Sequence, residues 1–555
     1  MAKNVKNQFR FQRNDSIGAP GAEEDVEFLQ ECFVDTGDCA LLASPSDRHV
    51  IILGRTGTGK TALLKELEKN NGDRTITIKP ENLALTYIGN STVLNFFTEL
   101  GINLDPFYKL LWRHVFTIEI LTRFFGQQDS AQTPSLFDRL RTFFSGSSRE
   151  EKDIKQTIDY LEEWGKKFWN ETEYRVKEIT QKVESELNNT LKATLGIKKL
   201  GIGAGQRRVD KLSEEQRTEI IKLGQEVVSK TQVRDLHQVF DLLDKVLADK
   251  QKTYYIVLDG LDENWVEERL RYKLIMGLIL TAREFIQVNN AKVVIALRRD
   301  LLDRVFRLTR DSGFQEEKYQ GLYLPLTWTK QTLLDILDRR VQQLVKRRYT
   351  KQPVTYTDML PKEYHGQKIE DYIYSIAKQP RDIIAFFNSC ILAAIDKPKL
   401  SVTDMTKAVK EYSRLRLRAL GDEWYADYPT LLDFAGILNS RPSSFKVDTI
   451  AQPSIEEICL NIVISNPQNK GLLIGAARSM IDDVIDWTDF CKTLFQVFYR
   501  IGLVGLKTSP DMNASWIDDA SQPVTRSQID ENTSVVVAPK YAIALGVHNW
   551  VSYKG

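Results

Sequence analysis

The sequence is poor in the residues that build disulfide frameworks and zinc sites. It contains five cysteines in 555 residues, scattered and odd in number, and five histidines without an HExxH spacing. Disulfide-rich domains and zinc sites need cysteines or histidines at short, regular spacings. We therefore expect neither kind of site, and we expect a reducing compartment, the cytoplasm.

A charge excess of one sign and a long apolar run are also missing. Lys and Arg number 76 and Asp and Glu number 75, so the net charge of +1 neither indicates nor excludes nucleic acid. The most apolar long segment, Pro106–Phe125, contains Lys109, Arg113, Glu119 and Arg123. These charges predict an amphipathic helix, and we expect no membrane span and no signal peptide.

Short apolar runs alternate with helical patterns between residues 49 and 326. This alternation is typical of a parallel α/β sheet with helices on its faces. A long, almost wholly helical insert, at about 93–247, separates the second run from the third. The expected strands are His49–Leu53, Arg74–Lys79, Tyr254–Leu258, Lys292–Leu297 and Gly321–Leu326.

One segment fits the phosphate-loop pattern GxxxxGK[ST] without a mismatch. Its glycines let backbone N–H groups approach phosphate oxygens, and the helix that follows directs its positive end at the same anion. Lys60 is expected to reach the β- and γ-phosphates and to assist catalysis, and Thr61 to bind Mg²⁺. The sequence has no Asn/Thr-Lys-x-Asp motif of the kind that recognises guanine, and this favours ATP over GTP. The predicted nucleotide-binding residues are Gly54, Arg55, Thr56, Gly57, Thr58, Gly59, Lys60 and Thr61.

Three acidic residues follow the apolar run that ends at Leu258. Asp259 comes directly after this run, where a Walker-B acid would bind Mg²⁺. Asp262 or Glu263 would orient or deprotonate the attacking water, and we prefer Glu263 although the spacing does not separate them. The segment therefore predicts hydrolysis as well as binding.

Three arginines are candidates for contacting the phosphates of ATP. Arg299, just after the run Val293–Leu297, is our choice for sensing the γ-phosphate, with Arg298 as a finger acting on a neighbouring subunit. Arg381 opens a helix in a later helical region and would reach phosphate if that region covers the site. Equally, the first two could form a solvated pair that caps a helix, and Arg381 could be a surface residue.

With these motifs the chain resembles bacterial P-loop ATPases of the Sll1717-like group, STAND/AAA+-like proteins related to KAP and NACHT NTPases. The resemblance rests on Phe33–Asp38, Gly54–Thr61, Leu258–Glu263, Leu297–Asp300 and Gln379–Asp382. It implies that another strand separates the acid-bearing strand from the P-loop strand. It also implies a helical lid and a C-terminal winged-helix-like domain, to which the segment around Val504 and Val535–Val537 would contribute the wing.

The motifs and the resemblance together predict four regions. Residues 1–48 form an N-terminal extension, 49–328 the P-loop ATPase core, 329–420 the helical lid and 421–555 the winged-helix-like domain. We find no nuclease, protease or TIR motif. We therefore expect a homo-oligomeric regulatory ATPase that switches its assembly or a separate effector protein, in bacterial antiphage defence.

A nucleic-acid-binding motor or DNA-stimulated ATPase is the alternative function. It would use the winged-helix-like domain and the basic runs Arg339-Arg340 and Lys346-Arg347-Arg348. Asp335 and Asp338 lie on the same predicted helix, so a solvated charged face is the simpler interpretation of these runs.

Overall fold

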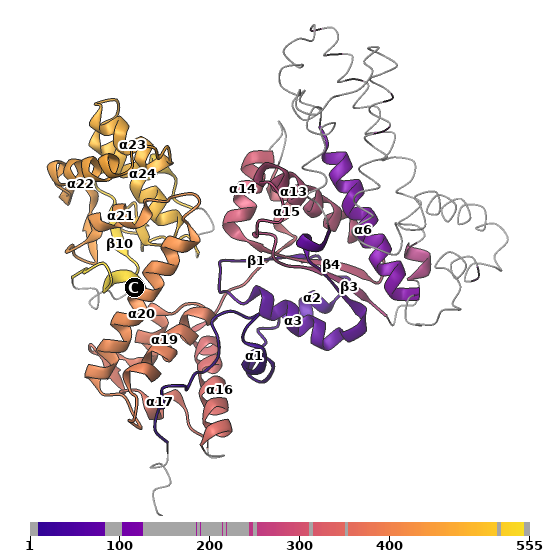
Figure 1. The fold of residues 1–555 in the computed structure, drawn as a ribbon, viewed down its shortest axis with the longest axis horizontal. Helices are drawn as coiled ribbons and strands as arrows, with labels where there is room; N and C mark the ends of the chain where they lie inside the picture. Colours follow the sequence, from indigo (N-terminus) through magenta and orange to yellow (C-terminus); the bar gives the residue numbers. More distant parts are fainter. Residues whose placement is uncertain are drawn as a thin grey trace, which may run out of the picture. The chain divides into compact units, whose positions relative to one another are not determined.

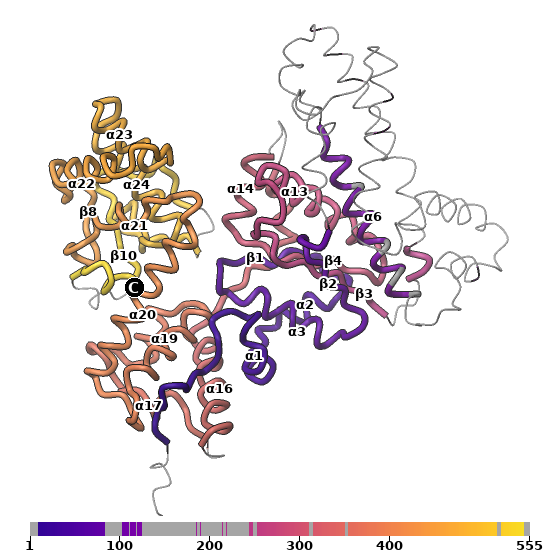
Figure 2. The backbone as a smooth tube through the Cα atoms, viewed as in Figure 1, coloured from indigo at the N-terminus to yellow at the C-terminus, as the bar shows by residue number. Residues whose placement is uncertain are grey.

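The chain folds into two compact units, Asp35–Thr327 and a second unit that combines Met1–Val34 with Trp328–Gly555. The computed structural model describes residues 9–83, 103–125, 243–247, 252–309, 315–349, 353–518 and 523–548, with isolated positions between 142 and 222 (Figures 1 and 2). The expected extension 1–48 is therefore divided between the units. Most of the predicted insert, 93–247, lies outside the described residues.

The first unit is built on a five-stranded sheet in the order β2-β3-β4-β1-β5. Every pairing in this sheet is parallel. The strands match the five predicted apolar runs, and β4 lies between β1 and β3, as the resemblance implied. Their bounds are β1 Ile51–Gly54, β2 Thr75–Ile78, β3 Tyr254–Leu258, β4 Ala291–Arg298 and β5 Tyr323–Pro325.

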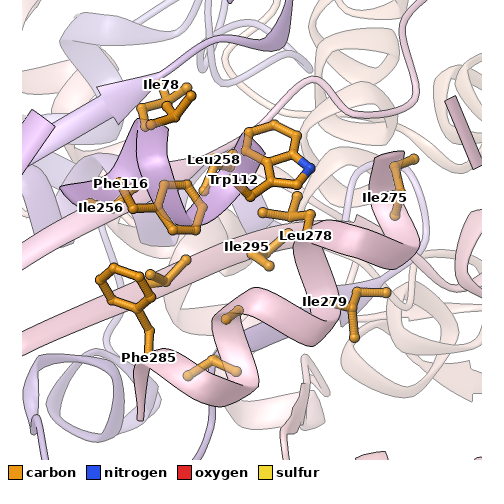
Figure 3. Close-up of a cluster of buried hydrophobic side chains, with 14 of the residues drawn as sticks. Ile78, Trp112, Phe116, Ile256, Leu258, Ile275, Leu278, Ile279, Phe285 and Ile295 are labelled. Carbon is orange, nitrogen blue, oxygen red and sulfur yellow. The ribbon is translucent and has the colours of Figure 1, made fainter. Parts of the chain in front are cut away.

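Helices cover both faces of this sheet (Figure 1). On one face, Trp112, Phe116 and Phe285 pack with the strand residues Ile256 and Ile295, and all five are at most 1% exposed (Figure 3). Removing this much aromatic and branched apolar surface from water stabilises the layer. This face carries α6 Asp105–Phe125, α13 Glu268–Phe285 and α14 Arg299–Thr309, and the other carries α2 Asp38–Ala43 and α3 Lys60–Asn71.

The predicted amphipathic helix is α6. Its apolar side packs on α13, and its Lys109 and Arg113 both pair with Glu284 of α13. Among the described residues, no helix is long and apolar enough to cross a membrane.

The helical part of the second unit combines residues 9–34 with the helices between Lys330 and Glu423, from the two separate segments of its sequence. Residues 9–34, here called the N-terminal arm, pack against α16 and α19. Phe11 is fully buried and meets Phe387 edge to face, and Asp25 forms a buried ion pair with Arg340. The helices are α1 Val26–Cys32, α16 Lys330–Arg348, α17 Tyr356–Met359, α18 Ile369–Ile376, α19 Pro380–Ala393 and α20 Val402–Glu423, and a short hairpin joins β6 Glu363–Tyr364 to β7 Gln367–Lys368.

The rest of the second unit combines helices with a three-stranded antiparallel sheet in the order β8-β10-β9. Buried Asp382 of α19 connects it to the helical part. Its carboxylate lies 2.9 Å from Arg416 Nε of α20 and 3.2 Å from Lys540 Nζ of α25. The elements are α21 Leu431–Ala435, β8 Ser444–Lys446, α22 Gln452–Ser465, α23 Leu472–Ile481, α24 Trp487–Arg500, β9 Val504–Lys507, β10 Ser534–Val537 and α25 Pro539–Ala542.

Candidate nucleotide site

The predicted phosphate loop joins the end of β1 to the start of α3. Gly57 and Gly59 have φ angles of 89° and 99°, a left-handed conformation that favours glycine. A Cβ atom at Gly54 would collide with the side chain of Thr58, whose hydroxyl donates to Arg55 O at 2.9 Å. The loop conformation therefore depends on glycine at these three positions.

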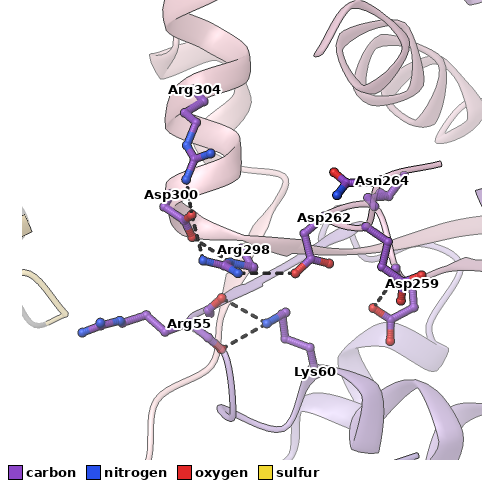
Figure 4. Close-up of polar contacts among 12 residues, drawn as sticks. Arg55, Lys60, Asp259, Asp262, Asn264, Arg298, Asp300 and Arg304 are labelled. Carbon is purple, nitrogen blue, oxygen red and sulfur yellow. Dashed lines mark hydrogen bonds and ion pairs between the residues drawn. The ribbon is translucent and has the colours of Figure 1, made fainter. Parts of the chain in front are cut away.

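Lys60 and Thr61 stand at the first turn of α3, next to Asp259, the acid that directly follows β3. Lys60 Nζ donates to Gly54 O at 3.2 Å and to Arg55 O at 3.1 Å (Figure 4). Thr61 Oγ1 donates to Asp259 Oδ2 at 2.6 Å, across 198 positions of sequence. The structure thus brings the two predicted nucleotide motifs into direct contact.

Burial shifts the pKa values of two of these charged groups. It lowers the pKa of Lys60, an effect that the carboxylates of Asp259 and Asp262 oppose. Burial also raises the pKa of Asp259, although hydrogen bonds from Thr61 and from the Gly260 N–H lower it in turn. Both groups are thus partly removed from water, where a bound cation or phosphate would interact more strongly than in bulk solvent.

Residues 259–263 form a tight turn after β3. Gly260 has a φ angle of 72°, and its carbonyl accepts from the Glu263 N–H at 3.2 Å. A Cβ atom at Gly260 would come within 3.3 Å of Glu263 Oε1, so the carboxylate lies directly over this glycine. Loss of hydration, with the nearby carboxylates of Glu81 and Asp262, raises the pKa of Glu263.

Arg298 is the arginine that the structure brings to the phosphate loop. It ends β4 opposite Gly54 of β1, and its guanidinium donates to both carboxylate oxygens of Asp300 at 3.0 Å. Its Nη1 also lies 3.6 Å from Asp262 Oδ2 (Figure 4). Arg299, our preferred sensor, instead begins α14 and pairs with Asp303 on that helix with a half-exposed side chain.

Two other predicted residues have different surroundings. The Arg55 carbonyl accepts from Lys60, but its side chain extends away from Lys60 in Figure 4. Arg381 stands in the first turn of α19, which belongs to the second unit. A phosphate contact by Arg381 stays a prediction.

Sequence reasoning missed Arg271 and the partners of Arg298. Arg271 of α13 is only 7% exposed, and its Nη1 donates to Glu263 O at 2.7 Å and to Asn264 Oδ1 at 2.9 Å. A signal was present, because Arg271 shares the helix face of buried Ile275 and Leu278 at the i+4 and i+7 positions. A cation within an apolar stripe of a helix indicates a buried polar partner, which here is the turn at Glu263 and Asn264.

The parallel sheet of the first unit, its strand order and the glycine-rich loop after β1 are consistent with the fold of a P-loop NTPase. In the second unit, residues 331–421 match the family model described as the FunZ-associated C-terminal helical domain. That match extends from α16 into α20 and does not include the nucleotide motifs.

Two more extensive similarities span almost the whole chain. It is 21% identical, over 547 residues, to the 80.3 kDa protein attributed to transposon gamma-delta of Escherichia coli (strain K12), covering 97% of this chain and 68% of that protein. A solved Walker-type ATPase of Pyrococcus abyssi is similar at 12% identity and a TM-score of 0.35, covering 96% of this chain and 98% of that one.

Proposed function

We propose that this chain binds ATP with Mg²⁺ and hydrolyses it. The observation that carries the proposal is the 2.6 Å contact between Thr61 Oγ1, in the first turn of α3, and Asp259 Oδ2, in the turn after β3. A hydroxyl and a carboxylate are the oxygen ligands, direct or through water, that Mg²⁺ prefers beside phosphates. The residues present therefore fit a Mg²⁺–nucleotide complex.

Each charged residue of the site has a separate task in this proposal. Lys60 exchanges its carbonyl partners for phosphate oxygens, and Arg298 contacts the γ-phosphate. Asp262 holds Arg298, which leaves Glu263 to accept the proton of the attacking water. Its raised pKa suits that task. When bound, Mg²⁺ neutralises charge on the phosphate oxygens.

Two substitutions test binding and hydrolysis separately. Lys60→Ala is expected to abolish ATP binding and turnover, while Glu263→Gln keeps binding and loses about 10²–10⁴-fold in kcat. Lys69→Ala is the matched control, because Lys69 lies on the same helix and its side chain is 51% exposed. Turnover by Lys60→Ala at the wild-type rate would refute the assignment.

The role of this ATPase activity is proposed to be regulatory. The resemblance of its motifs to STAND/AAA+-like NTPases supports a homo-oligomer whose nucleotide state controls a separate effector protein, and the antiphage role rests on that resemblance alone. Light scattering with and without ATP tests the assembly, and phage plating on cells with wild-type or Lys60→Ala protein tests the defence role. If Lys60→Ala changes neither the ATP-dependent assembly nor the phage plating efficiency, the proposed regulatory switch is refuted.

The proposed architecture adds a helical lid at residues 329–420 and a winged-helix-like domain at 421–555. The order β8-β10-β9, in which the middle strand is antiparallel to both neighbours, supports a winged-helix-like arrangement. The pairing of Val504 of β9 with Val537 of β10 supports the proposed wing.

Two observations weigh against the alternative of a nucleic-acid motor. Residues 421–555 contain ten Lys and Arg against sixteen Asp and Glu, so this region would repel a phosphate backbone. The basic runs of α16 are engaged by the N-terminal arm, through Arg339 with Phe33 O, Arg340 with Asp25, Arg347 with Glu27 and Glu31, and Arg348 with Asp15. Stimulation of ATP turnover by DNA, steeply reduced by salt, would restore the alternative.

A further inference from the structure

The direction of Glu263 is set by its backbone. In the described part of the chain, its carboxylate accepts no hydrogen bond, although it lies over Gly260. Its peptide groups, in contrast, are held on both sides. The N–H donates to Gly260 O at 3.2 Å, and the C=O accepts from Arg271 Nη1 at 2.7 Å. A change in the backbone here would therefore move the carboxylate directly.

Arg271 connects this turn to a rigid helix. The same Nη1 atom lies 2.9 Å from Asn264 Oδ1 and 3.5 Å from Asp262 O, so one guanidinium contacts three successive residues. Arg271 comes from the first turns of α13, whose Leu274 and Ile275 are fully buried in the core beside the sheet. A site supported by a packed helix is held more tightly than a site on a free loop.

The stability of the fold does not by itself explain why residue 271 is a cation. Arg271 is 7% exposed, and the oxygens that it contacts among the described residues are neutral. Removing a guanidinium from water is costly, and an apolar side chain of similar volume often stabilises such a position equally well. The three contacts to the acidic turn are what an apolar residue would not supply.

We propose that Arg271 is a positioning residue for ATP hydrolysis, which holds the backbone carbonyls of Asp262 and Glu263 and the side chain of Asn264 so that Glu263 is aimed at the attacking water. The inference rests on the proposed function. Lys60, Thr61 and Asp259 are held by contacts that do not include Arg271. Arg271 therefore acts on the chemical step and leaves nucleotide binding unchanged.

The test compares Arg271→Met with wild-type protein and with Arg269→Met, a control at an exposed position of the same helix. Loss of the three contacts lets the turn shift, and a misplacement of about 1 Å costs on the order of 10²-fold in rate. We expect Arg271→Met to lower kcat by that factor with KM for ATP and thermal midpoint nearly unchanged. Arg269→Met should behave as wild type.

A double-mutant cycle separates positioning from a merely structural role. If Arg271 acts through Glu263, then Arg271→Met added to Glu263→Gln lowers kcat no further. Losses that multiply, or wild-type kcat in Arg271→Met, would overturn the proposal while the ATPase assignment stands. A wild-type chain that binds ATP without turnover would overturn both, so the two failures are distinguishable. If Arg271→Met unfolds, Arg271→Lys, which keeps a cation and loses the planar fork, replaces it in the same cycle.

Discussion

Arg298 and Arg299 are adjacent in the sequence but lie in different chemical surroundings. Arg298 is the last residue of β4, and Asp300 and Asp262 hold its guanidinium beside Lys60. Its positive charge contributes to the lowered pKa of Lys60, which is a further sign that the two are close. Arg299 begins the next helix, where its side chain is half-exposed.

Substituting each arginine in turn distinguishes their roles. Arg298→Ala should lower kcat about 10²–10³-fold, the usual effect of removing a donor that stabilises transition-state charge. Arg299→Ala should retain most activity, because its described contact is the 4.0 Å pair with Asp303. Steady-state ATP turnover checks both. If Arg299→Ala lowers kcat more than Arg298→Ala does, Arg299 and not Arg298 is the residue that senses the γ-phosphate.

At this scale the sequence predicts which residues gather but not how they are oriented. The GxxxxGK[ST] spacing predicted a helix that begins at Lys60 and Thr61, and α3 begins there, while phosphate binding by these residues stays a prediction. The choice between Asp262 and Glu263 depends on a turn in which Gly260 adopts a left-handed φ angle. The choice between Arg298 and Arg299 depends on where β4 ends, a boundary that apolar periodicity does not define.

Among the elements, the short helix α2 shows how the sheet positions the segment before the phosphate loop. Lys292 of β4 is 3% exposed, and its Nζ donates to Leu41 O at 2.9 Å and Ser44 O at 2.7 Å. Tyr255 of β3 donates to Ala43 O at 2.6 Å. The carbonyl end of α2 is thus capped by two neighbouring strands.

Lys292 should give the fold a characteristic pH dependence. Burial lowers its pKa to about 8 from the ordinary 10.5. Below about pH 8 the folded chain carries the cost of a buried charge, and that cost disappears as pH rises toward 10.5, where the unfolded chain also loses the proton. Wild-type stability relative to Lys292→Met should therefore increase between pH 7.5 and 10.5.

Denaturant unfolding of the two proteins at several pH values measures this difference. Titration of tyrosines and cysteines is common to both proteins and cancels in the comparison. A difference in unfolding free energy that stays constant over the range would show that Lys292 ionises normally.

The strands of the core were predictable because buried parallel strands are continuous apolar runs. The N-terminal arm was not, since its contacts join residues more than 300 positions apart. Arg347, for example, reaches Glu27 across 320 positions. The local sequence pattern predicted a helix at Arg339–Arg348, but it could not predict which acidic residues pair with the arginines of that helix.

At the scale of the whole molecule, the second unit depends on an ionic cluster between its helical and C-terminal parts. Asp382 is fully buried and faces two cations, Arg416 and Lys540, which are 12% and 17% exposed. The attraction of Asp382 contributes to the raised pKa of Arg416 despite its burial. Removing the shared anion would therefore leave two cations side by side.

Asp382→Asn should lower the free energy of unfolding by about 3–5 kcal/mol, the usual effect of breaking a buried ion pair. Lys540→Met should cost less, because Arg416 still neutralises Asp382. Arg414→Met on the same helix as Arg416 is the control, since its side chain is 67% exposed. Chemical denaturation measures all three, and equal stability of Asp382→Asn and wild type would contradict the role of the cluster.

The N-terminal arm has a consequence for the order in which the chain is made. Asp25 leaves the ribosome 315 residues before Arg340, its buried partner. At synthesis rates of about 5–20 residues per second, Asp25 waits roughly 15–60 s for its partner on α16, and Phe11 waits longer still for Phe387 of α19. All of residues 35–327 are made in that interval. The arm can therefore pack only after the ribosome has synthesised both nucleotide motifs. A product truncated before α16 would expose the apolar residues of the arm, which chaperones and proteases recognise.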